Sequence, residues 1–300
     1  MPRRTAQVFE SVQVMSTAEI FRESIRVLLL HPTHFHSISI FLLSPLPFSF
    51  FVSHFLVHQF PTIPPSTIRL TRKLFGHNGA QPLVRLLSET IVHIIICFPS
   101  SVTFSLLGRA ATVQAVSDSY NGISLNGRRL FMRSGLAWVK LLHTCFWEFF
   151  IAISLFGVLV VSLVTVPKIL FACGVCSMVL GFWGVLGLLG IPFCVGFAHI
   201  TVVGNLARVL SVLENECYGF ASLMKAKSLI EGRRQTALLM TLFSNVGLRL
   251  VECLFEFRMC KGMSLWEGLM LASMYSLVLV LDTVMNVVFY YTCKSLNFDV

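Results

Sequence analysis

The sequence predicts an all-α fold: a polytopic membrane bundle of about six transmembrane helices with interfacial amphipathic helices. Hydrophobic residues make up 55% of the chain and charged residues only 12%, about half the charged fraction of a soluble domain. The apolar residues form long runs, each near the roughly 20 residues that span hydrocarbon. Short basic clusters separate the runs, as is typical of membrane helices oriented against the cytosol. Helices are expected because lipid offers backbone groups no water, and the alternation of β-barrel strands is missing.

The net charge of +9 does not indicate a nucleic-acid partner, because the basic residues lie in those short clusters. The nine cysteines are scattered, so no disulfide framework is expected. Cys173 and Cys176 have the spacing of a redox or metal pair, yet no second pair or histidine accompanies them. His31, His34 and His36 are interpreted as interfacial residues, since no carboxylate or cysteine lies close in sequence. No metal and no cofactor is therefore expected.

The N-terminal region is predicted to hold a mobile tail and one amphipathic helix. Residues 1–15 have no clear pattern, whereas Ser16 and Glu19 have the spacing of a capping box. The helix is expected to run to about Leu30 and to stop before Pro32. Its apolar face is formed by Ile20, Phe21, Ile25, Val27 and Leu28. Such a helix before a membrane span is expected to lie in the interface; the alternative is a cytosolic helix packed on the bundle.

Six apolar runs follow, and residues 16–300 are expected to form a single membrane domain. The predicted spans are 36–58, 88–110, 142–166, 169–197, 235–255 and 266–291. Pro45 and Pro47 predict a kink in the first span. The third and fourth spans are separated only by Val166-Pro167-Lys168, which predicts a tight antiparallel hairpin at that point.

The fourth span is rich in glycine, at Gly181, Gly184, Gly187, Gly190 and Gly196. Glycine thins a helix, so close packing of neighbouring helices is expected along it. The alternative is a flexible or broken helix beside a conduction path, as transporters use.

The distribution of Lys and Arg predicts that both termini are cytosolic. Fifteen basic residues fall on the side of the termini and seven on the other. The segment 61–87 is the exception, because it places four basic residues outside. An uncleaved first span implies entry at the endoplasmic reticulum, so residence there or at the plasma membrane is expected.

The two long loops predicted on the cytosolic side, near 111–140 and 203–234, resemble each other. In each, an acidic residue and a tyrosine precede a glycine, which is Gly122 in the first loop and Gly219 in the second. An amphipathic stretch and basic residues follow, so a repeated unit of span, interfacial helix and span is expected. The basic residues are candidate contacts for anionic lipid headgroups: Arg128, Arg129, Arg133, Lys225, Lys227, Arg233 and Arg234.

The second loop also carries a family resemblance. The words VLSVLE at 209–214, Tyr218-Gly219 and KAKSLIEG at 225–232 resemble a plant family of six-span membrane proteins of unknown function. The segment 19–32, which ends in His-Pro, resembles the start of that family. The family in turn is distantly similar to the membrane domain of some bacterial glycerophosphodiester phosphodiesterases. The resemblance implies no activity, because the catalytic domain of those enzymes has no counterpart here.

Charges inside the predicted spans are the strongest functional signal. They are Glu148, Arg249, Glu252 and Asp282. A lone charge at the centre of a span costs about 2.5–3.5 kcal/mol on insertion scales. Arg249 and Glu252 are three residues apart on one helix and are predicted to pair, with Glu148 and Asp282 completing a buried network. Two interpretations remain open: a polar path or ligand site, or structural ion pairs that fix helix packing.

The leading functional prediction is a non-catalytic structural or adaptor membrane protein whose basic helices touch anionic headgroups. The alternative is a small-solute transporter or channel that uses the intramembrane charges. A lipid-directed membrane enzyme comes third, because the chain lacks a Walker loop, HExxH, GxSxG and a dinucleotide fingerprint.

Overall fold

The chain forms helices throughout the part that the structure describes. The computed structural model describes residues 16–30, 32–40, 102–123, 127–172, 174, 178–214, 216–261 and 264–297. Within these ranges every regular element is helical and no strand occurs, so the predicted all-α class holds there. Several predictions lie outside the described residues: the tail 1–15, most of the spans 36–58 and 88–110, the Pro45 and Pro47 kink, His31, and the Cys173 and Cys176 pair.

Helix α2 (Thr17–Leu30) begins at the predicted capping box. The backbone N–H of Ser16 donates to Glu19 Oε2 at 2.6 Å, and the Glu19 N–H donates to Ser16 Oγ at 3.4 Å. The hydrogen bond from the Ser16 backbone lowers the pKa of the Glu19 carboxyl. Ile20 and Val27 are buried, and α2 packs against α11. Helix α2 therefore packs on the bundle, and its position in the membrane interface stays a prediction. Helix α3 (Pro32–Ile38) follows.

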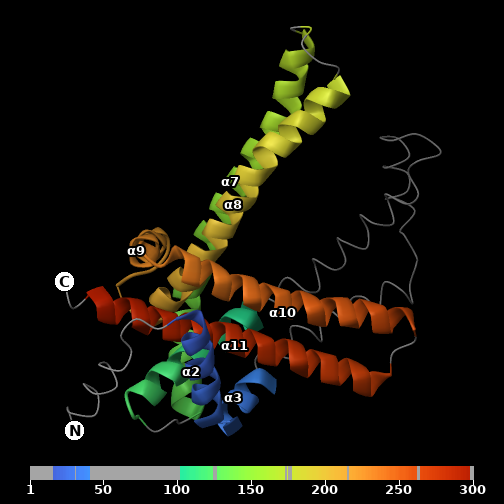
Figure 1. The fold of residues 1–300 in the computed structure, drawn as a ribbon. Coiled ribbons are helices and arrows are strands. Elements are labelled where there is room, and N and C mark those ends of the chain that lie inside the picture. The colour runs from blue at the N-terminus through green and yellow to red at the C-terminus, as the bar shows by residue number, and fades with distance from the viewer. Residues whose placement is uncertain are drawn as a thin grey trace, which may run out of the picture.

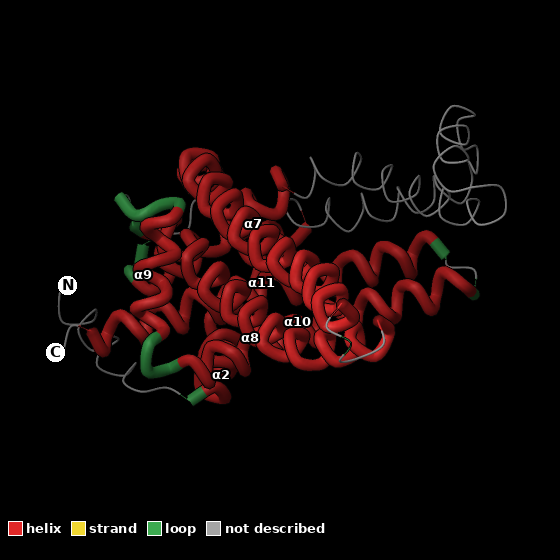
Figure 2. The backbone as a smooth tube through the Cα atoms, turned by 90° about the horizontal axis from the view of Figure 1, so that it is seen from above, coloured by secondary structure: helices red, strands yellow, loops and turns green. Residues whose placement is uncertain are grey.

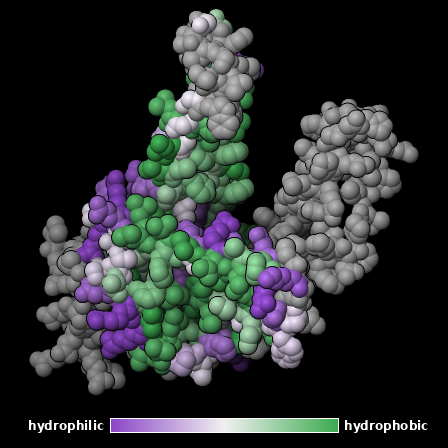
Figure 3. Space-filling model, turned by 45° about the vertical axis from the view of Figure 1, so that its right-hand side comes forward, coloured by the Kyte–Doolittle hydropathy of each residue, from purple (hydrophilic) through white to green (hydrophobic). Residues whose placement is uncertain are grey.

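Helices α7 (Gly127–Ala172) and α8 (Met178–Leu213) form a long hairpin that projects from the rest of the molecule (Figure 1). The turn predicted at Val166-Pro167-Lys168 is wrong, because α7 continues through Pro167 to Ala172. Proline is tolerated inside an apolar helix when neighbouring groups satisfy the freed carbonyl. Hydrophobic residues cover most of the visible described surface of this hairpin (Figure 3). Exposed apolar side chains on it include Phe149, Phe156, Val161, Leu188 and Ile191.

The predicted loops 111–140 and 203–234 are mostly helical. Residues 102–120 are helical, α7 already starts at Gly127, and α8 runs to Leu213. The predicted boundaries are wrong because they follow the positions of the charged residues. Arg133 and Arg208 find carboxylate partners inside the fold, so the helices need not end before them. The short helix predicted after Gly122 is not separate but forms the start of α7. The predicted repeat is therefore realised as a separate helix only after Gly219.

That helix is α9 (Phe220–Ile230), and α10 (Arg234–Cys260) and α11 (Leu265–Asn297) complete the chain. Leu223 and Ile230 of α9 are buried as an amphipathic helix requires, and the polar Ser222 is buried as well. The Ser222 hydroxyl donates to the Gly219 carbonyl at 2.8 Å, which satisfies it inside the fold.

Four described helical segments are long and apolar enough to cross a membrane. They are Gly127–Ile169, Leu186–Leu213, Arg234–Arg258 and Trp266–Ser295. They overlap the last four predicted spans, and the described part of the chain supplies four candidates rather than six. The chain is thus consistent with a membrane protein.

The buried core lies where the helices meet, at the foot of the α7–α8 hairpin. Helix α11 packs there against both α2 and α8, and the three helices lie close together in the view from above (Figure 2). Fully buried members include Ile20, Val116, Leu206, Leu210 and Val284. We call this region the base. The α7–α8 and α10–α11 hairpins diverge from it (Figure 1).

Candidate functional site

Two ion pairs between helices lie near the foot of the hairpins. Arg208 on α8 donates through Nη2 to Glu148 Oε1 on α7 at 3.2 Å, and each side chain is 18% exposed. Arg109, in the helix over 102–120, lies 3.6 Å from Asp282 on α11, measured from Nη1 to Oδ2. Their side chains are 17% and 7% exposed. We call these four residues the buried charge cluster.

The two pairs act on one another electrostatically. Arg109 interacts with Arg208 and Glu148 as well as with Asp282. Arg208 interacts with Asp282 as well as with Glu148. The two arginines repel one another and the two carboxylates attract both of them, so the four charges, from four helices, influence one another and cancel in formal sum. Such pairing offsets the cost of removing each charge from water, which a lone buried charge would carry in full.

Neutral polar groups complete the shell around Asp282. Ser244 on α10 donates through Oγ to Asp282 Oδ1 at 2.7 Å. The Asn286 amide donates to the same oxygen at 3.2 Å and to the Asp282 carbonyl at 2.8 Å. The carboxylate thus has partners on α10, on α11 and in the helix over 102–120. A buried carboxylate is stable only when such partners satisfy its oxygens.

The guanidinium of Arg208 is satisfied in the same way. Besides Glu148, it donates through Nη2 to Asn205 Oδ1 at 2.8 Å and through Nε to the Gly204 carbonyl at 3.2 Å. Gly204 also makes room for the ion pair, because a Cβ at this position would collide with the carboxylate of Glu148. The absence of a side chain at Gly204 therefore allows α7 and α8 to bring the two charges together.

The glycines singled out in the sequence behave differently from Gly204. A Cβ at Gly184, Gly187 or Gly190 would meet nothing within 4 Å, and one at Gly196 would lie 3.5 Å from the Leu155 side chain. The close packing expected along this series is therefore not found at three of its members. The glycine that allows a close approach is Gly204, which lies outside this series and one helical turn before Arg208.

The four charged residues predicted to form one network do not come together. Arg249 and Glu252 do pair, through a 2.8 Å hydrogen bond from Arg249 Nη1 to Glu252 Oε2. The Arg249 side chain is 84% exposed and that of Glu252 35%, however. We call these two residues the outer pair. Glu148 and Asp282 are instead paired with Arg208 and Arg109, two partners that the sequence reasoning missed. Arg208 was overlooked because it follows the apolar window, although its neighbours Leu206 and Leu210 are apolar.

We call the turn at Gly122 the first turn and the turn at Gly219 the second turn. The candidate headgroup residues of the first turn lie at the base, where α7 begins. Arg128 and Arg129 are exposed. Arg133 is half-exposed and donates through Nη1 to Asp118 Oδ1 at 3.0 Å. Arg133 therefore has a partner inside the protein. Arg128 and Arg129 are exposed and add to the basic surface.

The candidate headgroup residues of the second turn lie on or beside α9. Lys225 forms an ion pair with Glu214, and this hydrogen bond raises the pKa of Lys225. Lys227 is exposed. Arg233 is half-buried, and Arg234 lies 3.4 Å from Glu231, with both side chains more than half exposed.

Consecutive tyrosines on α11 hold both turns at the same end of the molecule. The Tyr290 hydroxyl donates to Glu214 Oε1 at 3.1 Å, and the Tyr291 hydroxyl donates to Ser117 Oγ at 3.0 Å. The two turns also share a backbone feature, since φ is +67° at Gly122 and +65° at Gly219. This left-handed conformation favours glycine. The two segments predicted as loops therefore lie at one end of the molecule, as expected if both face the same side of a membrane.

The described part of the chain contains no group of three or more His, Cys, Asp or Glu side chains able to hold a metal ion. Its carboxylates at the cluster are instead neutralised by arginine.

Comparisons with known proteins place the sequence without assigning a chemistry. A family described as a domain of unknown function (DUF8558) matches residues 6–299. No curated protein and no solved structure matches the chain.

Proposed function

The chain belongs to the DUF8558 family, whose function is unknown, and from its structure we propose a non-catalytic, multi-pass integral membrane protein with a structural or adaptor role. The observation that carries the proposal is the internal pairing of the buried charge cluster. Each of its four charges has an opposite charge from another helix, and Asp282 and Arg208 have further neutral partners. This arrangement fixes how four helices meet at the base.

We propose a six-span topology in the membrane of the endoplasmic reticulum or in the plasma membrane. Both termini would lie in the cytosol. Four described segments are apolar enough to span, and the apolar runs 36–58 and 88–110 would supply the other two. The contacts at the base support one side of the membrane for α2, the first and second turns and the last turns of α11, because these segments meet there. On this topology the exposed Arg128, Arg129 and Lys227 face anionic headgroups, each contributing about 1 kcal/mol when well placed.

The resemblance to the plant family of six-span membrane proteins, and through it to the membrane domain of bacterial glycerophosphodiester phosphodiesterases, remains part of the proposal. It accords with the four described segments that are apolar enough to span a membrane. It adds no substrate.

A transporter or channel is the second candidate, favoured by the three charges of the cluster that lie in segments apolar enough to span a membrane. Such a protein needs a hydrated route to those charges. The groove that opens between α8 and α10 is lined mainly by apolar residues, and none of the four charged residues lines it. A lipid-directed enzyme, the third candidate, would need a carboxylate free to take a proton, whereas Glu148 and Asp282 each face a guanidinium.

An osmotic assay on proteoliposomes separates the first two candidates. We expect the purified protein to give the same swelling rates as empty liposomes in glycerol, urea and potassium chloride gradients. A swelling rate above that of empty liposomes, and lost in a folded Glu148→Gln/Arg208→Gln variant, would replace the structural proposal with the transporter.

A further inference from the structure

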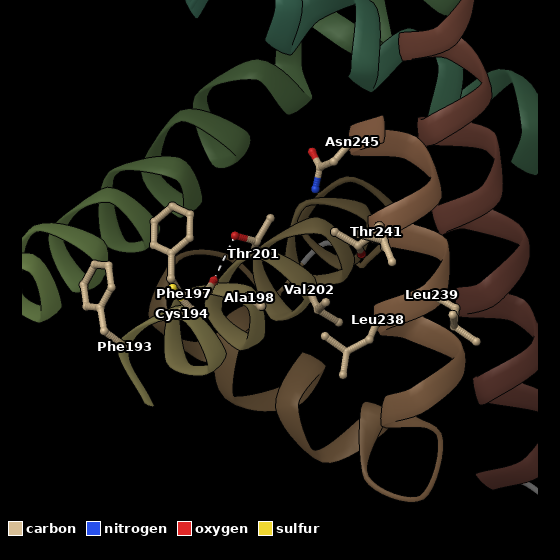
Figure 4. Close-up of a pocket in the computed structure, with 11 residues that line it drawn as sticks. Phe193, Cys194, Phe197, Ala198, Thr201, Val202, Leu238, Leu239, Thr241 and Asn245 are labelled. Carbon is tan, nitrogen blue, oxygen red and sulfur yellow. Dashed lines mark hydrogen bonds between the residues drawn. The ribbon is translucent and has the colours of Figure 1, made fainter. Parts of the chain in front are cut away.

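An apolar groove of about 410 Å³ lies between α8 and α10, on the flank where the two hairpins diverge. Phe193, Phe197 and Ala198 contribute from α8, and Leu238 and Leu242 from α10 (Figure 4). The α8 residues line one side of the groove and the α10 residues the other. Phe197, Leu238 and Leu242 remain exposed, so the groove is open to its surroundings.

The groove lies within segments that are apolar enough to be in the bilayer. Its α8 wall falls in Leu186–Leu213 and its α10 wall in Arg234–Arg258. In a membrane the molecules that meet such a surface are lipids, and an apolar channel between two helices accommodates a hydrocarbon chain.

One cation lies on α10 one helical turn before the groove begins, and a second lies on α9, which packs on α8. Arg234 begins α10 one helical turn before Leu238, so the two side chains share a face of that helix. Arg234 and Lys227 both act electrostatically on His199, the neighbour of the groove residue Ala198. Lys227 is exposed, and the pairing of Arg234 with Glu231 joins two exposed side chains. An exposed pair of this kind is weak and leaves the guanidinium able to bind an anion.

We propose that this groove holds one acyl chain of an anionic phospholipid whose phosphate contacts Lys227 and Arg234. The apolar walls match the chain, and the cations at one end match the phosphate and an additional negative charge on the headgroup. The inference rests on the proposed membrane-integral role and deepens it, because it names a partner for the basic second turn. The lipid would join α8, α9 and α10 from outside, where the buried charge cluster joins helices from inside.

Native mass spectrometry of the full chain in detergent, with added dioleoylphosphatidylserine or dioleoylphosphatidylcholine, tests the site. We expect one phosphatidylserine to stay bound to each protein molecule and to be retained at least about fivefold better than phosphatidylcholine. A fivefold difference corresponds to about 1 kcal/mol, the contribution of one well-placed cation at the membrane surface.

Two variants dissect the site. Ala198→Trp fills the groove and should lose the retained molecule of either lipid, whereas Val195→Trp, on an exposed position that does not line the groove, should keep it. Lys227→Gln/Arg234→Gln should remove the preference for phosphatidylserine but keep weak binding. Arg22→Gln/Arg26→Gln on α2 makes the same charge change elsewhere and should keep the preference.

Three outcomes would overturn the proposal. Equal retention of phosphatidylserine by Ala198→Trp and the wild type would place the lipid elsewhere. Equal retention of the two lipids by the wild type would remove the role of the cations. A dimer that Ala198→Trp dissociates, without retained lipid, would make the groove an interface between two copies. None of these results affects the swelling assay, which tests the structural role separately.

Discussion

The outer pair and three of the four charges of the buried charge cluster lie in helices apolar enough to span a membrane, yet the two groups differ in exposure and in the number of helices that they join. The cluster joins four helices through side chains that are at most 18% exposed. The outer pair joins two residues on one face of α10, and Arg249 is 84% exposed. The difference teaches that the pair most visible in sequence, three residues apart, constrains the fold least, because both of its members already belong to one helix.

The largest effect is expected from breaking the cluster on one side only. Arg208→Met leaves the partly buried Glu148 without its cation, which should cost up to about 3–5 kcal/mol of unfolding free energy, the range for a buried pair. Arg249→Met is the matched control, since it removes the same type of side chain from an exposed position. Thermal unfolding in detergent, followed by fluorescence-detected size exclusion, measures both. Equal loss of folded protein in the two variants would remove the distinction between cluster and outer pair.

Removing a neutral partner of the cluster should have the next largest effect. Ser244→Ala deletes the 2.7 Å hydrogen bond to Asp282 and should destabilise the protein by about 1.5–3 kcal/mol, the range for hydrogen bonds to charged groups. Ser273→Ala is the control, because that hydroxyl bonds only the Met270 carbonyl of its own helix. The same thermal assay should show little change for this control, and a stable Ser244→Ala protein would contradict the assigned role of Ser244.

Adding a methyl group at Gly204 tests the space that the ion pair occupies. Gly204→Ala should push the carboxylate of Glu148 away from Arg208 and destabilise the protein by about 1–3 kcal/mol. Gly187→Ala, where a Cβ meets nothing within 4 Å, should be neutral or stabilising by up to about 1 kcal/mol because alanine favours helix. A Gly204→Ala protein as stable as Gly187→Ala would mean that the two helices do not need this close approach.

The smallest effect is expected at the outer pair itself. Glu252→Gln removes the charge opposite Arg249 but can keep the 3.5 Å contact with the Tyr275 hydroxyl. We expect a smaller change than for Ser244→Ala, because both members of the pair lie on one helix and the contact with Tyr275 can remain. A loss comparable to that of Ser244→Ala would show that the outer pair supports the fold after all.

Local features of the fold were predictable from sequence, and contacts between distant segments were not. The capping box at Ser16 and Glu19 and the pairing of Arg249 with Glu252 follow from spacings of three residues. The apolar runs gave the helices that could span, because length and composition decide that property. The Glu148–Arg208 pair joins residues 60 positions apart, and nothing in the local pattern selects one partner among the available arginines.

Helix ends were misplaced for a related physical reason. A charged residue after an apolar run suggests that the chain has reached water and that the helix ends. Arg208 is instead satisfied within the protein by Glu148, Asn205 and the Gly204 carbonyl. The helix α8 therefore continues to Leu213, past the point where apolar content falls. Likewise Pro167 suggested a turn, although the helix passes through it.

The most direct test of the central claim is a double-mutant cycle on the Glu148–Arg208 pair. The unfolding free energies of Glu148→Gln, Arg208→Gln and the double variant would be measured against the wild type in detergent. If the pair is a structural link, the double variant should be less destabilised than the sum of the single variants by at least about 1 kcal/mol, within the range for contacting residues. Effects that add to within about 0.3–0.5 kcal/mol, the behaviour of independent sites, would contradict the account.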